Sequence, residues 1–164
     1  MTVVIADSSP LNYLTLIGSI EVLHRLYGAV IVPRQVIAEL IDPAAPEDVR
    51  KWASDLPKWI DLRETVVNDD DMTHLDPGER AAIVLAQSEP GALLLIDEMA
   101  GRIEASRRGI RNTGTLGVLR AAALKDYLDF PAALARLLET NFRVSMELVT
   151  ALLAEDAERR RRTE

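Results

Sequence analysis

Residues 3–10 read Val-Val-Ile-Ala-Asp-Ser-Ser-Pro, and this stretch decides the fold class. The four apolar residues, three of them β-branched, predict a short buried strand. Asp7 ends that strand, and the serines followed by Pro10 are typical of the start of a helix. A buried strand that leads directly into a helix is the first half of a βα unit, so we expect the strand to lie in a parallel sheet.

The same alternation continues along the chain. Further strands are expected at residues 29–32, 59–62, 92–96 and 110–112. The helical patterns that separate or follow them cover residues 11–26 with a break at Gly18, 33–41, 46–56, 77–88, 98–108, 115–126, 131–140 and 145–160. Strands alternating with helices predict the α/β class, as a three-layer α/β/α sandwich with a mostly parallel central sheet.

Length and composition favour one domain. The chain has 164 residues, 48% of them hydrophobic, with neither a repeat nor a linker. We expect a single domain over residues 1–164, with the C-terminal helices at about 131–160 packed on it. A bilayer-spanning helix needs about 18 or more apolar residues in a row, and the chain has no such run. It also opens without a signal-peptide pattern, so we expect a cytoplasmic protein with no membrane contact.

The net charge and the side chains available as metal ligands limit the kinds of site that the chain can form. A net charge of −7 excludes uniform electrostatic attraction to nucleic acid, although Arg102, Arg107, Arg108 and Arg111 crowd one stretch. The absence of cysteine excludes disulfides, thiolate metal sites and cysteine nucleophiles. The two histidines lack the spacing of a zinc-protease motif. Carboxylates are therefore the main candidates for metal ligands.

Four carboxylates stand where an α/β fold would bring them together: Asp7, Glu39, Glu79 and Asp97. Asp7 and Asp97 each follow four apolar residues, at the carboxyl ends of expected parallel strands, where such sheets bind ligands. The two glutamates lie in expected helices. Four like charges in one cluster repel each other strongly unless a cation lies among them, so the set predicts a divalent-metal enzyme.

Each acid also has an ordinary structural role. Asp7 can cap the helix that follows it, although Ser8 and Ser9 can serve instead. Asp97 can be an N-terminal helix charge. Asp76-x-x-Glu79 matches a capping box, which explains Glu79 equally well. Glu39 alone would be an ordinary surface glutamate, and only the set gives it a functional reading.

Four polar residues close to these acids are candidates for orienting metal-bound water or phosphate: Ser8, Ser9, Asn12 and Thr115. All four can equally be helix-capping residues. The two glycines of Gly114-Thr115-Leu116-Gly117 lack the lysine of a phosphate-binding P-loop, so a tight turn explains them as well.

The acids lie in an ordered series of motifs at residues 7–11, 32–40, 75–83, 95–98 and 109–119. The series begins with Asp7-Ser8-Ser9-Pro10-Leu11 and includes Val32-Pro33-x-x-Val36-x-x-Glu39-Leu40. It continues through Leu75-Asp76-x-Gly78-Glu79, Leu95-Ile96-Asp97-Glu98 with Arg102 following, and Gly109-Ile110. In this order it resembles the PIN-domain ribonuclease family, nearest to the VapC-like toxin branch.

The resemblance implies that the first strand neighbours the strand at 92–96. Asp7 and Asp97 would then be the primary ligands of Mg²⁺ or Mn²⁺, with Glu39 and Glu79 binding a second ion or orienting water. Arg102 would hold substrate phosphate. The implied activity is hydrolysis of single-stranded RNA, leaving a 5′-phosphate and a 3′-hydroxyl. The implied partners are an antitoxin protein and a second copy of the chain in a homodimer.

Two departures from the family pattern keep an alternative open. Many relatives carry a hydroxyl residue immediately before the acid at position 97, where this chain has Ile96, and Thr115 is the available substitute. Many relatives also have Asp where this chain has Glu79, which lengthens the side chain by one methylene. The alternative is a catalytically degenerate PIN-like domain that serves as a binding or assembly module.

Overall fold

The computed structural model describes residues 2–68 and 70–164. Two positions of the expected domain over residues 1–164, Met1 and Asp69, therefore lie outside the described residues. Its described strands form one five-stranded sheet in the order β3-β2-β1-β4-β5. They are β1 (Val4–Ala6), β2 (Val30–Pro33), β3 (Ile60–Arg63), β4 (Leu93–Leu95) and β5 (Arg111–Thr113). All four strand pairs are parallel, and β1 pairs with β4 as expected, with Ala6 opposite Leu95.

Alternate strand residues enter two separate cores. Val4, Ala6 and Leu95 lie in one hydrophobic cluster, whereas Ile5 and Leu94 lie in the other. A sheet buried on both faces explains why these strands read as continuous apolar runs in the sequence. The strand order reverses between β1 and β4, which is the topological switch point where α/β folds bind ligands.

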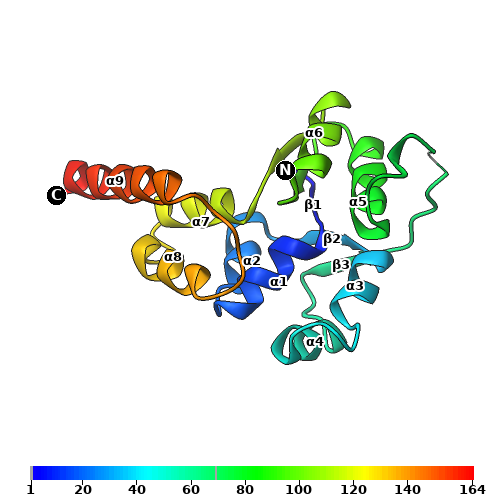
Figure 1. Ribbon diagram of the computed structural model, residues 1–164, viewed down its shortest axis with the longest axis horizontal. Helices are drawn as coiled ribbons and strands as arrows, with labels where there is room; N and C mark the ends of the chain where they lie inside the picture. Colours follow the sequence, from blue (N-terminus) through cyan, green and yellow to red (C-terminus); the bar gives the residue numbers. More distant parts are fainter. Residues whose placement is uncertain (1, 69) are drawn as a thin grey trace.

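Helices cover both faces (Figure 1). The first core is completed by α1 (Ser8–Leu16), α2 (Glu21–Tyr27), α3 (Arg34–Leu40), α4 (Glu47–Ser54), α7 (Thr115–Leu124), α8 (Phe130–Leu138) and α9 (Met146–Thr163). The second is covered by α5 (Pro77–Ser88) and α6 (Met99–Arg107), with a 3-10 turn at Asp70–Met72 adding Met72. The break between α1 and α2 falls at Gly18, whose φ of 74° suits glycine. The predicted three-layer α/β/α sandwich is confirmed.

The last two helices join the larger core through one face each. Leu134 and Leu137 of α8 and Val149 and Leu152 of α9 are buried in it. Figure 1 shows α9 extending away from the sheet toward the C-terminus. Its last turns lie along α7 and leave a groove of about 420 Å³ between the two helices.

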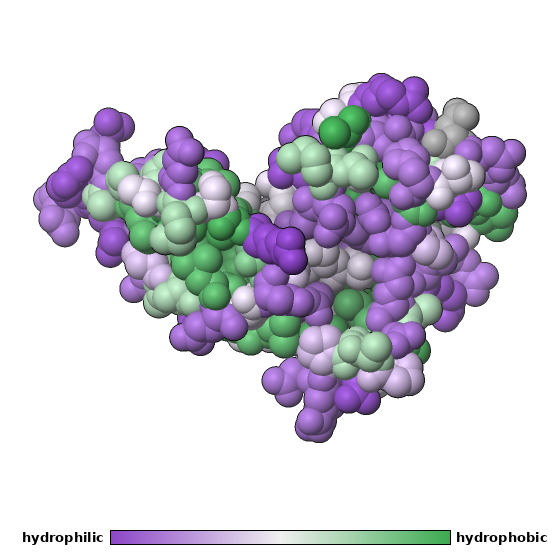
Figure 2. All heavy atoms as spheres, viewed as in Figure 1, coloured by the Kyte–Doolittle hydropathy of each residue, from purple (hydrophilic) through white to green (hydrophobic). Residues whose placement is uncertain are grey.

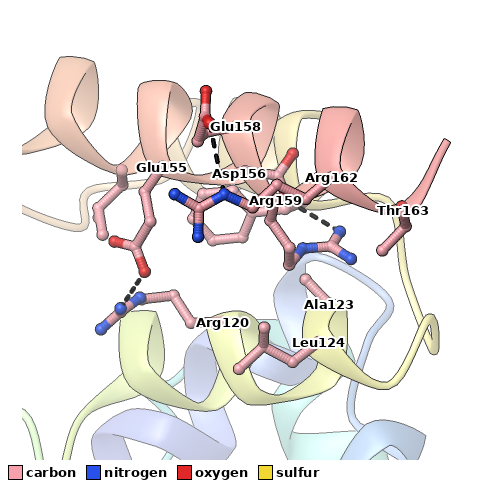
Figure 3. Close-up of a pocket in the computed structure, with 11 residues that line it drawn as sticks. Arg120, Ala123, Leu124, Glu155, Asp156, Glu158, Arg159, Arg162 and Thr163 are labelled. Atoms are coloured by element: carbon pink, nitrogen blue, oxygen red, sulfur yellow. Dashed lines mark hydrogen bonds and ion pairs between the residues drawn. The ribbon is translucent and has the colours of Figure 1, made fainter.

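Ion pairs along this groove help to attach α9 (Figure 3). Arg120 of α7 pairs with Glu155 of α9, and Arg159 of α9 pairs with Asp126, just after α7, at 3.7 Å. Within the described part of the chain, no helix has both the length and the apolar character required to cross a bilayer.

Candidate metal centre

The acids gather at the carboxyl edge of the sheet, at the switch point. Asp7 directly follows β1, and its backbone N–H donates to the carbonyl oxygen of Leu95 at 2.9 Å. Asp97 lies two residues beyond the end of β4. Asp7 is only 2% exposed, so this carboxylate lies almost entirely within the protein.

One group of three carboxylates has the spacing of a cation site. An oxygen from each of Asp7, Glu39 and Asp76 lies within 4.8 Å of the others, the one such grouping of Asp, Glu or His side chains among the described residues. Glu39 comes from the last turn of α3 and Asp76 from the N-cap of α5. The backbone N–H of Gly78 donates to Glu39 Oε1 at 2.8 Å and so ties these two elements together.

Asp76 is the site residue that the sequence analysis missed. It had been assigned only to the capping box, and that role is present: Asp76 Oδ1 accepts the backbone N–H of Glu79 at 2.8 Å. A carboxylate has two oxygens, however, and a cap engages only one of them. The available signal was the position of Asp76 beside Glu79 in the motif of residues 75–83.

Glu79 combines the capping role with a buried acid. Its Oε1 accepts the backbone N–H of Asp76 at the long distance of 3.5 Å, and the residue is 6% exposed. Its Oε2 is buried without a hydrogen-bond partner among the described residues, as is Oδ1 of Asp7. Buried polar atoms in native proteins are nearly always satisfied, so each orphaned oxygen indicates a ligand or a proton.

Asp97 is held in place on both oxygens. Its Oδ1 accepts the backbone N–H of Thr115, and its Oδ2 accepts the hydroxyls of Ser9 and Thr115, all at 2.7 Å. It is not in the three-carboxylate group, although it is near enough for its charge to raise the pKa of Asp7. Thr115 is fully buried, so its hydroxyl positions Asp97 and is not open to solvent as a substrate contact.

The remaining sequence-predicted residues occupy two places. Ser8 lies among the acids, because its hydroxyl acts to lower the pKa of Glu39 and its backbone acts to lower that of Asp7. Asn12 lies one helical turn later on α1 and is half-buried. Arg102 instead donates to Asn112 on β5 at 3.2 Å.

The arginine stretch beyond Arg102 is engaged with an acid of its own helix. Both Arg107 and Arg108 donate to the buried Glu104. These hydrogen bonds, with that from Arg107 first, lower the pKa of Glu104 to about 2. The basic patch suggested by the sequence is therefore partly neutralised within the fold.

Three glycines make room for three of the carboxylates. An added Cβ would lie 2.5 Å from Glu39 Oε1 at Gly78, 2.8 Å from Glu79 Oε2 at Gly101 and 2.6 Å from Asp97 Oδ1 at Gly114. All three distances are shorter than a van der Waals contact. Glycine at these positions lets backbone approach the acids closely, which sequence spacing alone did not indicate.

The raised pKa values of the clustered carboxyl groups indicate that this site favours a bound proton or cation. Burial raises the pKa of Asp7 to about 8; the Ser8 backbone opposes the rise, and the charges of Asp76, Glu39 and Asp97 add to it. Burial, followed by the hydrogen bond and charge of Asp76, raises the pKa of Glu79 to about 8. Burial also raises the pKa of Glu39, against the Ser8 hydroxyl. Without a cation, the cluster retains protons at neutral pH.

The donor set fits a hard divalent cation. The three side chains of the group offer carboxylate oxygens as ligands, which suit Mg²⁺, Mn²⁺ or Ca²⁺ better than softer metals. The two orphaned oxygens belong to Asp7 and Glu79, the acids with the most strongly raised pKa. A cation bound to Asp7 would satisfy its orphaned oxygen and would offset the burial and the neighbouring charges that raise these pKa values.

Comparison with known proteins places the chain in a family. Residues 3–158 match the model of the DUF3368 family, described as a PIN domain. A solved structure, a PilT N-terminus domain protein SSO1118 from the hyperthermophilic archaeon Sulfolobus solfataricus P2, is similar in fold. The TM-score is 0.52 with 14% sequence identity, over 88% of this chain and 100% of that chain. No curated protein matches. The family match spans nearly the whole described sheet and its helices, so the chain belongs to the PIN-domain family.

Proposed function

We propose that this protein is an Mg²⁺- or Mn²⁺-dependent endoribonuclease that hydrolyses phosphodiester bonds of single-stranded RNA. The observation that carries the proposal is the group formed by Asp7, Glu39 and Asp76, beside the orphaned buried oxygens of Asp7 and Glu79. Its place at the switch point of a PIN-domain sheet supports a nuclease over other uses of an acidic cluster.

In this proposal Asp7, Glu39 and Asp76 hold the cation, with Glu79 as a fourth acid beside them. A bound divalent cation lowers the pKa of its water and offsets charge on the phosphate. The Gly78 backbone N–H orients Glu39, since it donates to that carboxylate, and the Ser8 hydroxyl favours its ionised form. The protein's own contribution is thus a set of acids whose positions are fixed before substrate arrives.

In this proposal Asp97 acts at the metal centre through its Oδ1 atom. Its Oδ2 already accepts two hydroxyl bonds, whereas Oδ1 accepts only the Thr115 backbone N–H. A carboxylate oxygen has two lone pairs, so Oδ1 retains one. We assign that lone pair to the cation or to the attacking water. The hydroxyl absent before Asp97 is replaced in this respect by Ser9 and Thr115, which fix the carboxylate.

The biological role that we propose is the toxin of a toxin–antitoxin pair, acting in the cytoplasm under the control of an antitoxin protein. The supporting observation is the sequence resemblance to the toxin branch. A small reading frame for a DNA-binding protein immediately upstream, whose product forms a complex with this chain and suppresses RNA cleavage, is the expected finding. If the protein instead has a housekeeping role in RNA processing, we expect neither the upstream reading frame nor suppression of RNA cleavage by its product.

We also propose a homodimer through the C-terminal helices. Figure 2 shows hydrophobic residues gathered on that part of the surface. The large apolar side chains exposed there include Leu124, Leu138, Met146 and Leu148. Exposed apolar surface of this kind favours association. Light scattering during size-exclusion chromatography should give twice the chain mass, and a concentration-independent monomer would contradict the proposal.

The nuclease proposal has a direct test. Cleavage of a single-stranded RNA should require Mg²⁺ or Mn²⁺ and fall by on the order of 100-fold or more in Asp7→Asn and Asp97→Asn. Asp55→Asn, an exposed residue at the C-cap of α4, changes net charge equally and should cleave normally. Metal-dependent activity unchanged in both site variants would refute the proposal. Absence of divalent-ion binding at millimolar concentrations, beside a stable partner complex, would establish the degenerate alternative.

A further inference from the structure

Aromatic side chains are scarce in this protein, and two of them stand apart. The chain has two Trp, three Tyr and two Phe. All seven pack in or against the larger core. Two of them, Tyr13 and Phe142, also pair with each other although they lie 129 positions apart in the sequence.

Tyr13 lies one helical turn from the side chain that holds Asp97. Ser9 donates to Asp97 Oδ2, and Tyr13 follows Ser9 by four residues on α1. Side chains four residues apart on a helix share one face, with Cβ atoms about 6 Å apart. The proximity has an electrostatic counterpart: burial raises the pKa of Tyr13, and the charges of Asp97 and Glu98 raise it further. The phenol is therefore neutral beside the acids.

The Tyr13 ring is fixed by the segment between α8 and α9. Its hydroxyl donates to Asn141 Oδ1 at 2.8 Å, and its ring meets Phe142 edge to face, with centroids 5.0 Å apart and planes at 84°. Figure 1 shows this connection crossing α1. In an edge-to-face pair, at least one face of each ring is not covered by its partner. Tyr13 packs against the larger core but is only half-buried, so part of this oriented side chain remains exposed.

A substrate with many phosphates needs a source of affinity other than net charge at the carboxyl edge of the sheet. The protein carries a net charge of −7, and the arginines Arg107 and Arg108 bond Glu104. Long-range attraction therefore contributes little to holding RNA at this edge. Stacking of bases on aromatic rings supplies affinity that does not depend on net charge and tolerates any base.

We propose that Tyr13, oriented by Asn141 and Phe142, stacks with an unpaired base of single-stranded RNA next to the phosphate that is cleaved. The inference rests on the proposed nuclease function and adds a substrate-positioning residue to it. It also gives a physical reason for preferring single strands, because a base must leave its helical stack to meet the ring.

The test uses a single-stranded RNA oligonucleotide that the wild-type protein cleaves with Mn²⁺. Tyr13→Leu should raise KM by about 5- to 150-fold, the range for loss of one base–aromatic stack, with a much smaller effect on kcat. Tyr13→Phe keeps the ring and should raise KM far less than Tyr13→Leu. Tyr27→Leu, a half-buried tyrosine in the core layer, is the matched control and should leave KM unchanged.

An oligonucleotide with an abasic site beside the cleaved bond separates stacking from structural support. If Tyr13 stacks with that base, the abasic substrate raises KM for wild type, and Tyr13→Leu then adds little. The same KM penalty from Tyr13→Leu on both oligonucleotides would overturn the inference, as would no penalty on either. In both cases wild-type cleavage would leave the nuclease proposal intact. No metal-dependent cleavage by the wild type would overturn both.

A second measurement covers the case in which Tyr13→Leu does not fold. The wild-type protein is mixed in EDTA with the same RNA carrying 2-aminopurine at the flanking position. Stacking should quench the 2-aminopurine fluorescence as the RNA binds, whereas the same label several nucleotides away should change less. Equal quenching at both positions, or none, would overturn the inference.

Discussion

At the scale of single residues, the candidate centre depends on pairs of a carboxylate and a glycine. Glu39, Glu79 and Asp97 each lie where a Cβ on Gly78, Gly101 or Gly114 would intrude. The close backbone positions the acids without adding apolar bulk, and at Gly78 it also donates a hydrogen bond to Glu39. Replacing such a glycine should therefore disturb the site more than the fold.

Gly78→Ala provides a test at this scale. The new methyl would displace the Glu39 carboxylate, and we expect Mn²⁺ affinity to fall by about 10-fold or more. Stability should stay within about 1 kcal/mol of wild type or rise, because alanine is the better helix former. Isothermal titration calorimetry and chemical denaturation measure the two effects.

Gly18→Ala is the matched control for that variant. Gly18 has a φ of 74° and nothing near its missing Cβ, so alanine costs backbone strain of about 1–2 kcal/mol without touching the acids. We expect lower stability with unchanged Mn²⁺ affinity. If both variants lost stability and affinity together, the glycine contacts would have only a structural role.

At the scale of elements, the start of α5 serves two purposes. Asp76 and Glu79 close the capping box and also belong to the acidic cluster. The sequence suggested capping as an alternative to function for Glu79, but in the structure the capping residues themselves lie among the acids. Asp76 can cap α5 and also lie beside Asp7 and Glu39, since its carboxylate has two oxygens and each has two lone pairs.

Asp76→Asn should separate these two purposes. Asparagine caps a helix about as well as aspartate, so the unfolding free energy should change by less than about 1 kcal/mol. Loss of the negative charge should lower metal-dependent RNA cleavage by about 10-fold or more. Asp129→Asn, at the equivalent cap of α8 where Asp129 accepts the backbone N–H of Ala132, should leave cleavage unchanged. Equal activity in the two variants would remove Asp76 from the proposed ligand set.

At the scale of the whole molecule, the cluster links stability to pH. Asp7 and Glu79 have a folded pKa of about 8, against about 4 in the unfolded chain. The folded state therefore binds more protons between these values, and stability falls as pH rises from about 4 to about 8. Glu104, with its pKa lowered to about 2, acts oppositely and only in acid.

Thermal unfolding of the metal-free protein should therefore show a lower Tm at pH 8 than at pH 5. Mn²⁺ should raise Tm more at pH 8, where the acids are free of protons, than at pH 5. In Asp7→Asn both trends should weaken, because one of the two titrating groups is gone. A metal-free Tm that rises between pH 5 and pH 8 would show that these acids are ionised in the folded protein.

Much of the fold could be predicted because its determinants are local. The apolar runs ending at Ala6 and Ile96, and the helical spacing after each, indicate the βα order without knowledge of distant residues. Most observed elements differ from expectation by one to three residues at an end; for example, β3 extends to Arg63 and α9 to Thr163. Such ends depend on pairing and packing, which short patterns do not encode.

The α/β alternation, the strand-end positions of Asp7 and Asp97, and the resemblance to PIN domains that the family match confirms can all be inferred from the amino-acid sequence. Which acids meet depends on the tertiary structure. Asp7, Glu39 and Asp76 come from three elements, and Asp97 is bonded by Ser9 and Thr115 from two others. Distances between segments tens of residues apart arise from how the sheet and its helices pack, and no periodicity along the chain specifies them.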